Sequence, residues 1–211
     1  MGGARQHPRC APLPRRDELG EVPHNWWGWL AFWQGGLGVW GGIAGGALAG
    51  VVFLRRRGVD VARFAEAIAP GILLAQAIGR IGNYFNQELF GGPTSLPWAL
   101  EITPSHGLSG YLAYSTFHPT FLYELVWNLL LAGGLILFGR RRKIRPPGLF
   151  ALYVAGYSAF RIFEELLRVD PSHHFLGLRL NLYVAVALTL VGAAWFIRTQ
   201  RAERRPPRNS L

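Results

Sequence analysis

Long stretches without a charged residue constrain the fold of this chain more than any other sequence feature. The uncharged stretches are residues 25–54, 146–160 and 180–197. A helix needs about 20 predominantly apolar residues to cross a bilayer. Two further segments, 61–79 and 118–138, reach that length if Arg63, Glu66 and Glu124 are accepted within them. The sequence therefore predicts an all-α fold, a polytopic transmembrane helical bundle of about five spans.

The charge distribution favours a membrane protein over a nucleic-acid-binding protein. The chain has a net charge of +10, although 50% of its residues are hydrophobic and only 16% are charged. Of its 22 Lys and Arg residues, fourteen lie in residues 55–63, 140–145 and 198–208, at alternate ends of the predicted spans. This is the positive-inside pattern. It predicts a cytoplasmic C-terminus, places Arg80 and Glu88 toward the outer face, and argues against a nucleic-acid partner.

The sequence predicts three consecutive regions. A polar N-terminal segment of atypical composition covers residues 1–30, a transmembrane domain covers 31–198, and a basic cytoplasmic tail covers 199–211. Capping and breaking residues predict the helices of this domain at 36–54, 61–79, 118–139, 148–168 and 180–198. Residues 89–117 contain several Pro and Gly residues together with aromatic ones, which predicts an arm at the outer membrane interface.

Polar residues gather where the second predicted span ends, in the stretch Gly79–Gly91. Arg80 presents a planar fork of donors that matches a phosphate group and stays charged when partly buried. The simpler interpretation is that Arg80 extends to the interface or pairs with Glu88. Asn83 and Asn86 could contact a ligand or make hydrogen bonds within a turn. The stretch is therefore a candidate site for an anionic head group.

A second polar group follows one side of the fourth predicted helix. Its members are spaced by three and four residues, which places them on one helix face. They are Tyr157, Arg161, Glu164, Glu165 and Arg168. A structural interpretation is a salt bridge between Arg161 and Glu165 that holds the bundle together. Because ionisable residues within membrane helices usually mark a site, this face is also a candidate for function.

Three histidines and one carboxylate remain to be considered from residue chemistry alone. His118 begins the third predicted span at the outer face, where it could accept a proton or act only as a polar boundary residue. Glu124 lies further along the same helix and could anchor it to an arginine. His173 and His174 lack a matching spacing of other ligands, so no metal site is predicted.

Three blocks of this sequence resemble the prolipoprotein diacylglyceryl transferase family. They are Gly79–Gly91, the block His118-Pro119-Thr120-Phe121-Leu122-Tyr123-Glu124, and Gly156-Tyr157-Ser158-Ala159-Phe160-Arg161 with Glu165. The resemblance extends over about residues 33–198. By analogy, it implies functional roles for Arg80, Asn83, Glu88, Gly91, Tyr157, Arg161 and Glu165.

The resemblance implies a lipid-transfer reaction at a bacterial plasma membrane. The family moves a diacylglyceryl group from phosphatidylglycerol to the lipobox cysteine thiol of a prolipoprotein, and it forms a thioether. Lipid and peptide supply all reacting groups, so no cofactor is expected. Arg80 and Arg161 would stabilise the phosphate leaving group, while His118, Glu165 or Glu88 would accept the thiol proton. The alternative is a non-catalytic membrane protein that binds or transports an anionic lipid.

Two departures from the family pattern bear on activity. The family has seven helices, and residues 33–42 align with its third helix, so the chain is expected to lack the first two. An inactive, shortened transferase is therefore a further alternative. Trp40 also stands where many members have a histidine before a glycine pair, which removes one candidate base.

Overall fold

The computed structural model describes residues 37–107, 110–111, 113–169, 174–175 and 178–201. The N-terminal segment predicted at 1–30 and all but the start of the tail predicted at 199–211 lie outside these residues. The helices are α1 (Leu37–Arg56), α2 (Val61–Asn86), α3 (Thr120–Arg141), α4 (Gly148–Leu167) and α5 (Leu180–Arg201). Two antiparallel pairs of two-residue strands join β1 (Leu100–Glu101) to β2 (Thr116–Phe117) and β3 (His174–Phe175) to β4 (Leu178–Arg179). All five predicted helices are present.

The chain divides into two units, residues 1–59 and 60–211. The first unit contains α1, whose last turn carries Arg55 and Arg56. Cations suit this position because the C-terminal end of a helix has a partial negative charge. After the helix, Gly58 adopts a left-handed conformation with φ of 68°, which a residue without a side chain adopts at little cost.

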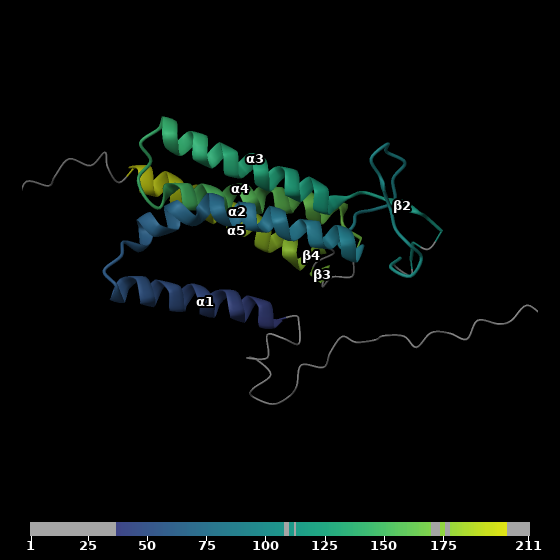
Figure 1. Cartoon of the computed structure of the whole chain (residues 1–211), viewed down its shortest axis with the longest axis horizontal. Coiled ribbons are helices and arrows are strands. Elements are labelled where there is room, and N and C mark those ends of the chain that lie inside the picture. The colour runs from purple at the N-terminus through teal and green to yellow at the C-terminus, as the bar shows by residue number, and fades with distance from the viewer. Residues whose placement is uncertain (1–36, 108–109, 112, 170–173, 176–177, 202–211) are drawn as a thin grey trace, which may run out of the picture. The chain divides into compact units, whose positions relative to one another are not determined.

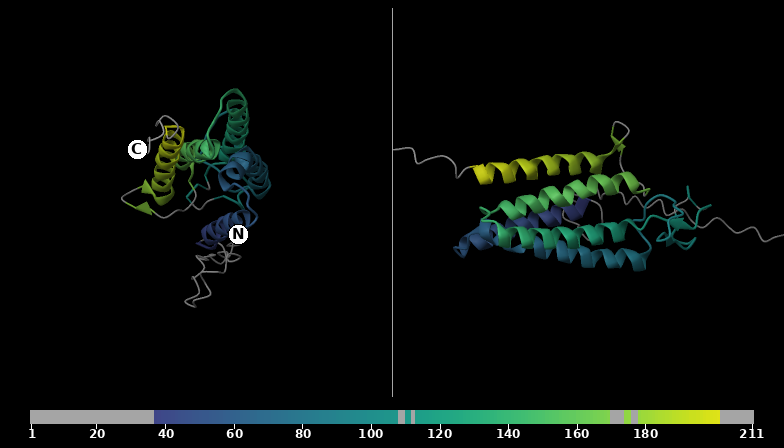
Figure 2. Two further views of the ribbon diagram at one scale, coloured as in Figure 1. Left: turned by 90° about the vertical axis from the view of Figure 1, so that its left-hand side faces the viewer. Right: turned by 90° about the horizontal axis from the view of Figure 1, so that it is seen from above.

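The second unit is a helical bundle centred on α4. Helices α2, α3 and α4 pack against one another, and α5 packs against α4 (Figures 1 and 2). Ala69 and Leu73 of α2 form a buried cluster with Ala132 and Leu135 of α3, and side chains of α4 cover it. Successive helices run in opposite directions, so residues far apart in the sequence meet at each end of the bundle.

Three helices in the described part of the chain are long and apolar enough to cross a membrane. They are α2, α3 and α5. Large apolar side chains on them are exposed, as a lipid environment requires: Phe85 is 76% exposed, Leu130 66% and Leu190 65%. The prediction of an all-α membrane bundle is confirmed, and spanning length and composition are shown for three of the five predicted spans. Helix α4 instead carries a group of ionisable residues near its C-terminal end.

Helix α2 is longer than its sequence predicts. It begins after Asp60, whose side chain accepts hydrogen bonds from the backbone N–H groups of Ala62 and Arg63. The predicted end at Gly79 is wrong, because the helix continues to Asn86. The residue that caps it, Gln87, adopts a left-handed backbone conformation. Glycine lowers helix propensity only moderately, and the helix hydrogen bonds continue through it. Arg80 and Asn83 therefore lie one turn apart on a helix rather than in a loop.

Helices α4 and α5 approach closely at Gly192. A Cβ atom built there would lie 2.7 Å from the backbone nitrogen of Ala155 and 3.0 Å from the backbone oxygen of Ala151. Small residues at such contacts let membrane helices pack backbone to backbone. The α4–α5 contact therefore depends on the missing side chain of Gly192.

We expect Gly192→Ala to lower the thermal unfolding temperature of the protein in detergent. Overpacking a close contact costs about 1–3 kcal/mol. Gly133 of α3 is the matched control, since a Cβ there would meet nothing within 4 Å. Gly133→Ala should leave the unfolding temperature unchanged or raise it. Equal effects of the two substitutions would contradict the close α4–α5 contact.

Candidate functional site

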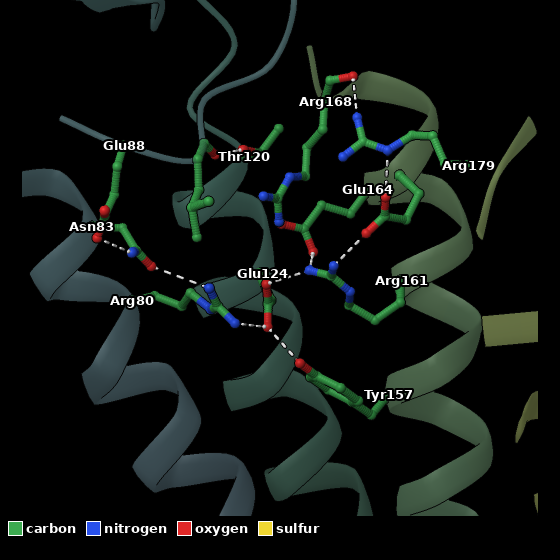
Figure 3. A network of polar contacts seen from close by, with 12 residues as sticks. Arg80, Asn83, Glu88, Thr120, Glu124, Tyr157, Arg161, Glu164, Arg168 and Arg179 are labelled. Atoms are coloured by element: carbon green, nitrogen blue, oxygen red, sulfur yellow. Dashed lines mark hydrogen bonds and ion pairs between the residues drawn. The ribbon is translucent and has the colours of Figure 1, made fainter. Parts of the chain in front are cut away.

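A fully buried carboxylate lies at the centre of the polar network in Figure 3. Glu124 of α3 is 0% exposed. One of its oxygens, Oε1, lies 2.9 Å from a terminal guanidinium nitrogen of Arg80 and accepts a 3.0 Å hydrogen bond from the Tyr157 hydroxyl. Its Oε2 lies 3.4 Å from a guanidinium nitrogen of Arg161. Glu124 therefore ties α2 and α4 to α3, and it anchors its helix to two arginines rather than to one.

The Arg80 side of the network continues toward the arm through two carboxamides. Arg80 donates to Oδ1 of Asn83 at 3.1 Å, and Nδ2 of Asn83 donates to Oε1 of Glu88 at 2.9 Å. Asn86 donates to the same Glu88 oxygen at 3.1 Å. The direct pairing of Arg80 with Glu88, one of the predicted alternatives, is wrong, because Arg80 pairs with Glu124 and reaches Glu88 only through Asn83. Both asparagines make side-chain hydrogen bonds to Glu88, and their contact with a ligand stays a prediction.

The Arg161 side of the network is formed by carboxylates of its own helix. Arg161 makes ion pairs with Glu164 and Glu165, three and four residues further along α4. The predicted salt bridge between Arg161 and Glu165 is therefore present. The second oxygen of Glu165 lies 2.7 Å from Nε of Arg179 in β4, and a terminal nitrogen of Arg179 donates to the backbone oxygen of Arg168 at 3.0 Å. The β3–β4 hairpin is thereby attached to the end of α4.

Arg80 and Arg161 come from different helices and converge on one carboxylate, as Figure 3 shows. Their side chains are 20% and 19% exposed, whereas those of Glu124, Glu164 and Glu165 are at most 1% exposed. The carboxylates thus hold the two guanidinium groups from the buried side. Each arginine carries more donors than its partners in the network use, so both retain donors for an anion. Guanidinium donors of this kind match the geometry of a phosphate group.

His118 belongs to a separate set of contacts. Its Nδ1 lies 3.1 Å from the Tyr123 hydroxyl, which accepts a 3.0 Å hydrogen bond from Nε1 of Trp98 in the arm. Within the described residues, no hydrogen bond or ion pair joins the ring to Glu124 or its arginines. His173 lies outside those residues. The arm and α3 thus position the imidazole through its Nδ1 atom. The other ring nitrogen, Nε2, does not take part in this contact.

Gly91 is required for close packing where the arm meets the bundle. A Cβ atom at this position would lie 2.8 Å from Cβ of His118 and 3.0 Å from the backbone oxygen of Leu167. The Gly91 N–H donates to the His118 backbone oxygen at 2.8 Å, and Gly91 also forms an isolated bridge with Arg168. Gly91 therefore fixes the positions of His118 and the end of α4 relative to each other.

The backbone on both sides of Glu88 adopts an uncommon conformation. Gln87 and Leu89 have φ values of 50° and 58°, in the left-handed region that non-glycine residues rarely adopt. Such residues tend to lie at functional sites, where surrounding contacts hold them. Here the Gln87 side chain accepts hydrogen bonds from both the backbone N–H and the hydroxyl of Thr103. The exposed Glu88 is therefore held in place between the end of α2 and the arm.

Sequence reasoning did not identify three features of this network. Glu124 was considered only as an anchor, Arg179 was not singled out, and neither was the chain of contacts from Trp98 through Tyr123 to His118. A signal for Glu124 existed, since a lone carboxylate within an apolar span must be paired to be stable there. No comparable signal marks Arg179, because its partner Glu165 lies fourteen residues earlier in the sequence and in a different element.

The fold and the network define a membrane-embedded helical protein with a buried arginine–glutamate site. A family model described as prolipoprotein diacylglyceryl transferase matches residues 21–198. A phosphatidylglycerol–prolipoprotein diacylglyceryl transferase from Cutibacterium acnes is 52% identical over 177 residues, which are 84% of this chain and 60% of that protein. Transferase 2 of the same name from Streptomyces coelicolor is 45% identical over 197 residues, 93% of this chain and 61% of that protein.

The chain belongs to the prolipoprotein diacylglyceryl transferase family. A relative from Frankia alni with the same printed name is 53% identical over 164 residues, which are 78% of this chain and 43% of that protein. The chain thus spans between 43% and 61% of the length of these three relatives. The family assignment predicted from the three sequence blocks is confirmed.

Proposed function

We propose that this chain transfers a diacylglyceryl group from phosphatidylglycerol to the lipobox cysteine thiol of a prolipoprotein. The convergence of Arg80 and Arg161 on Glu124 carries the proposal. Because both guanidinium groups are held by one carboxylate, both would be available to a single lipid phosphate. The relatives named above bear the name of this activity. The network joins six of the seven residues to which the family resemblance implies a role: Arg80, Asn83, Glu88, Tyr157, Arg161 and Glu165.

The reaction breaks a carbon–oxygen bond of the lipid and forms a carbon–sulfur bond. The cysteine thiol gives its proton to a base, and the thiolate sulfur attacks the glycerol carbon that carries the phosphate. The electron pair of the broken bond remains on the phosphate oxygen, so glycerol phosphate leaves. The acyl esters are unchanged, and no oxidation or reduction occurs.

Arg80 and Arg161 would lower the barrier by stabilising the charge that develops on the leaving phosphate. Fixed donors in a partly desolvated site stabilise such charge without reorganisation during the reaction. Glu124 would keep both guanidinium groups in position, and the Tyr157 hydroxyl would fix its Oε1 oxygen. Glu124 is therefore a positioning residue in this proposal, and the two arginines contact the substrate.

The contacts of the three candidate bases differ. Both oxygens of Glu165 are engaged by guanidinium groups, those of Arg161 and Arg179, which makes it the least available proton acceptor. One oxygen of Glu88 accepts two carboxamide hydrogen bonds and its side chain is exposed. His118 has one ring nitrogen beside Tyr123. We therefore retain His118 and Glu88 as the candidate bases.

The basic helix ends support an orientation of the site toward the outer face. Arg140 and Arg141 lie in the last turn of α3 and Arg198 and Arg201 in that of α5. The Glu124 network lies near the N-terminal end of α3, away from the basic turn of that helix. By the positive-inside rule, the network would face the outer side of a bacterial plasma membrane, and the C-terminus would lie in the cytoplasm. Phosphatidylglycerol and prolipoprotein peptides would meet there.

The test is turnover by membranes that contain this chain. They are incubated with phosphatidylglycerol and a synthetic lipobox peptide, and thioether-linked diacylglyceryl peptide is detected by mass spectrometry. The proposal predicts product with the cysteine peptide and none with a serine peptide of the same sequence. Binding of phosphatidylglycerol without any product would instead support the non-catalytic lipid-binding alternative.

A further inference from the structure

A second set of polar side chains lies one helical turn beyond the Glu124 network. Gln76 precedes Arg80 by four residues on α2, and Tyr153 precedes Tyr157 by four on α4, whereas Asn128 follows Glu124 by four on the antiparallel α3. Four residues correspond to about 6 Å along a helix. Because the three helices pack together, these residues occupy one level of the bundle. We call Gln76, Asn128 and Tyr153 the inner polar layer.

Asn128 is the buried member of the inner polar layer, and Gln76 and Tyr153 are half-buried beside it. Asn128 is 0% exposed, and the next residues on the same face of α3, Ala132 and Leu135, belong to the core. On α2, the buried Leu73 and Ala77 flank Gln76. A 3.3 Å hydrogen bond from Nε2 of Gln76 to the Tyr153 hydroxyl joins α2 to α4. The layer is therefore a structured group of polar residues at membrane depth.

Several polar atoms of this layer have no partner among the described residues. Neither the oxygen nor the nitrogen of the Asn128 carboxamide makes a hydrogen bond there, and the same holds for the Gln76 carbonyl oxygen. The Tyr153 hydroxyl accepts from Gln76, while its own hydrogen has no acceptor within the described part of the chain. An unsatisfied buried polar group costs about 1–3 kcal/mol, so retaining several at one level requires a reason.

The chemistry of these groups indicates the ligand. Tyr153 and the two carboxamides supply hydrogen-bond donors, and none of them carries a charge. In a diacyl glycerophospholipid, the uncharged acceptors on the acyl-chain side of the phosphate are the two ester groups. A lipid with its phosphate at Arg80 and Arg161 and its acyl chains along the helices would therefore bring its ester groups toward the inner polar layer.

We infer that Gln76, Asn128 and Tyr153 form a binding site for the ester-linked glycerol backbone of the lipid donor. This inference rests on the proposed function, because it takes the arginine pair as the phosphate site. The arginine pair would bind a diacyl phospholipid at its phosphate, and the inner polar layer would bind it at its ester carbonyls. They would thereby fix the glycerol carbon that the thiolate attacks.

The experiment compares phosphatidylglycerol with its diether analogue, in which a methylene group replaces each ester carbonyl. Transfer to the lipobox peptide and lipid binding by native mass spectrometry are both measured. The wild-type chain should prefer the ester lipid by about three- to tenfold, the contribution of one or two neutral hydrogen bonds. Tyr153→Phe and Gln76→Leu should reduce this preference toward one by weakening use of the ester lipid alone.

Asn128→Leu separates a binding role from a structural one. Because it replaces an unsatisfied carboxamide with an apolar group of similar size, we expect it to keep or raise the unfolding temperature while it lowers the ester preference. Thr189→Val is the control, since the Thr189 hydroxyl donates to the Ala185 oxygen of its own helix at 2.7 Å and makes no other hydrogen bond among the described residues. It should leave the preference unchanged.

An ester preference that all three inner-layer variants retain would overturn the inference. So would a wild-type chain that treats the two lipids equally. If the chain transfers neither lipid, the proposed function fails, and the ester preference in the binding measurement then decides the inference separately.

Discussion

Glu124→Gln should reduce diacylglyceryl transfer by at least about a hundredfold and destabilise the protein by about 3–5 kcal/mol, the range found when one partner of a buried ion pair is removed. The substitution keeps the shape of the side chain but removes the charge that Arg80 and Arg161 share. It also introduces N–H donors where only acceptors fit. Transfer rate and chemical unfolding of the same preparation measure the two effects.

Glu101→Gln is the matched control for this substitution. Glu101 is an exposed carboxylate on β1, outside the network, so its charge should matter little to stability. Wild-type transfer and stability in Glu124→Gln would show that the shared carboxylate does not position the arginines. Loss of stability with wild-type transfer would likewise contradict the positioning role.

Arg161→Ala should reduce transfer by about 10²–10³-fold, the loss typical when a fixed donor to a developing anion is removed. The substitution removes a guanidinium group that contacts three buried carboxylates, those of Glu124, Glu164 and Glu165. The lipid should still partition into the bundle through its acyl chains, so the loss should appear mainly in the transfer step. Single-turnover assays with saturating phosphatidylglycerol measure that step.

The control for Arg161→Ala is an arginine that pairs with a carboxylate outside the network. Arg63 lies 3.5 Å from Asp60, and its side chain is 81% exposed. Arg63→Ala should leave transfer within about twofold, because an exposed pair contributes about 1 kcal/mol at most. Similar losses of transfer in Arg161→Ala and Arg63→Ala would mean that transfer depends on the overall charge of the protein rather than on the network.

Much of the fold follows from the sequence because a membrane restricts the choices. Uncharged stretches and basic turns locate the helices to within a few residues, except at the end of α2. There Gly79 suggested the end of the helix, but intact backbone hydrogen bonding through the helix prevails over local propensity. Charged residues at spacings of three and four likewise predicted the Arg161–Glu165 pair.

The partners across helices could not be predicted in the same way. Periodicity shows that Arg80 and Arg161 lie near helix ends, but it does not show that Glu124 lies between them, since that depends on how α2, α3 and α4 pack. The contact of Arg179 with Glu165 depends on a hairpin whose strands are two residues long. Contacts formed by such short elements leave no periodic pattern in the sequence.

The central claim is that Arg80 and Arg161 bind one lipid phosphate, and nitrogen–phosphorus dipolar dephasing in solid-state NMR measures this most directly. The chain, labelled with ¹⁵N-arginine, is placed in phosphorus-free galactolipid bilayers that contain phosphatidylglycerol. We predict guanidinium dephasing by ³¹P that decreases in Arg80→Lys and in Arg161→Lys, but not in Arg63→Lys. Dephasing unchanged in either of the first two variants would contradict a shared phosphate site.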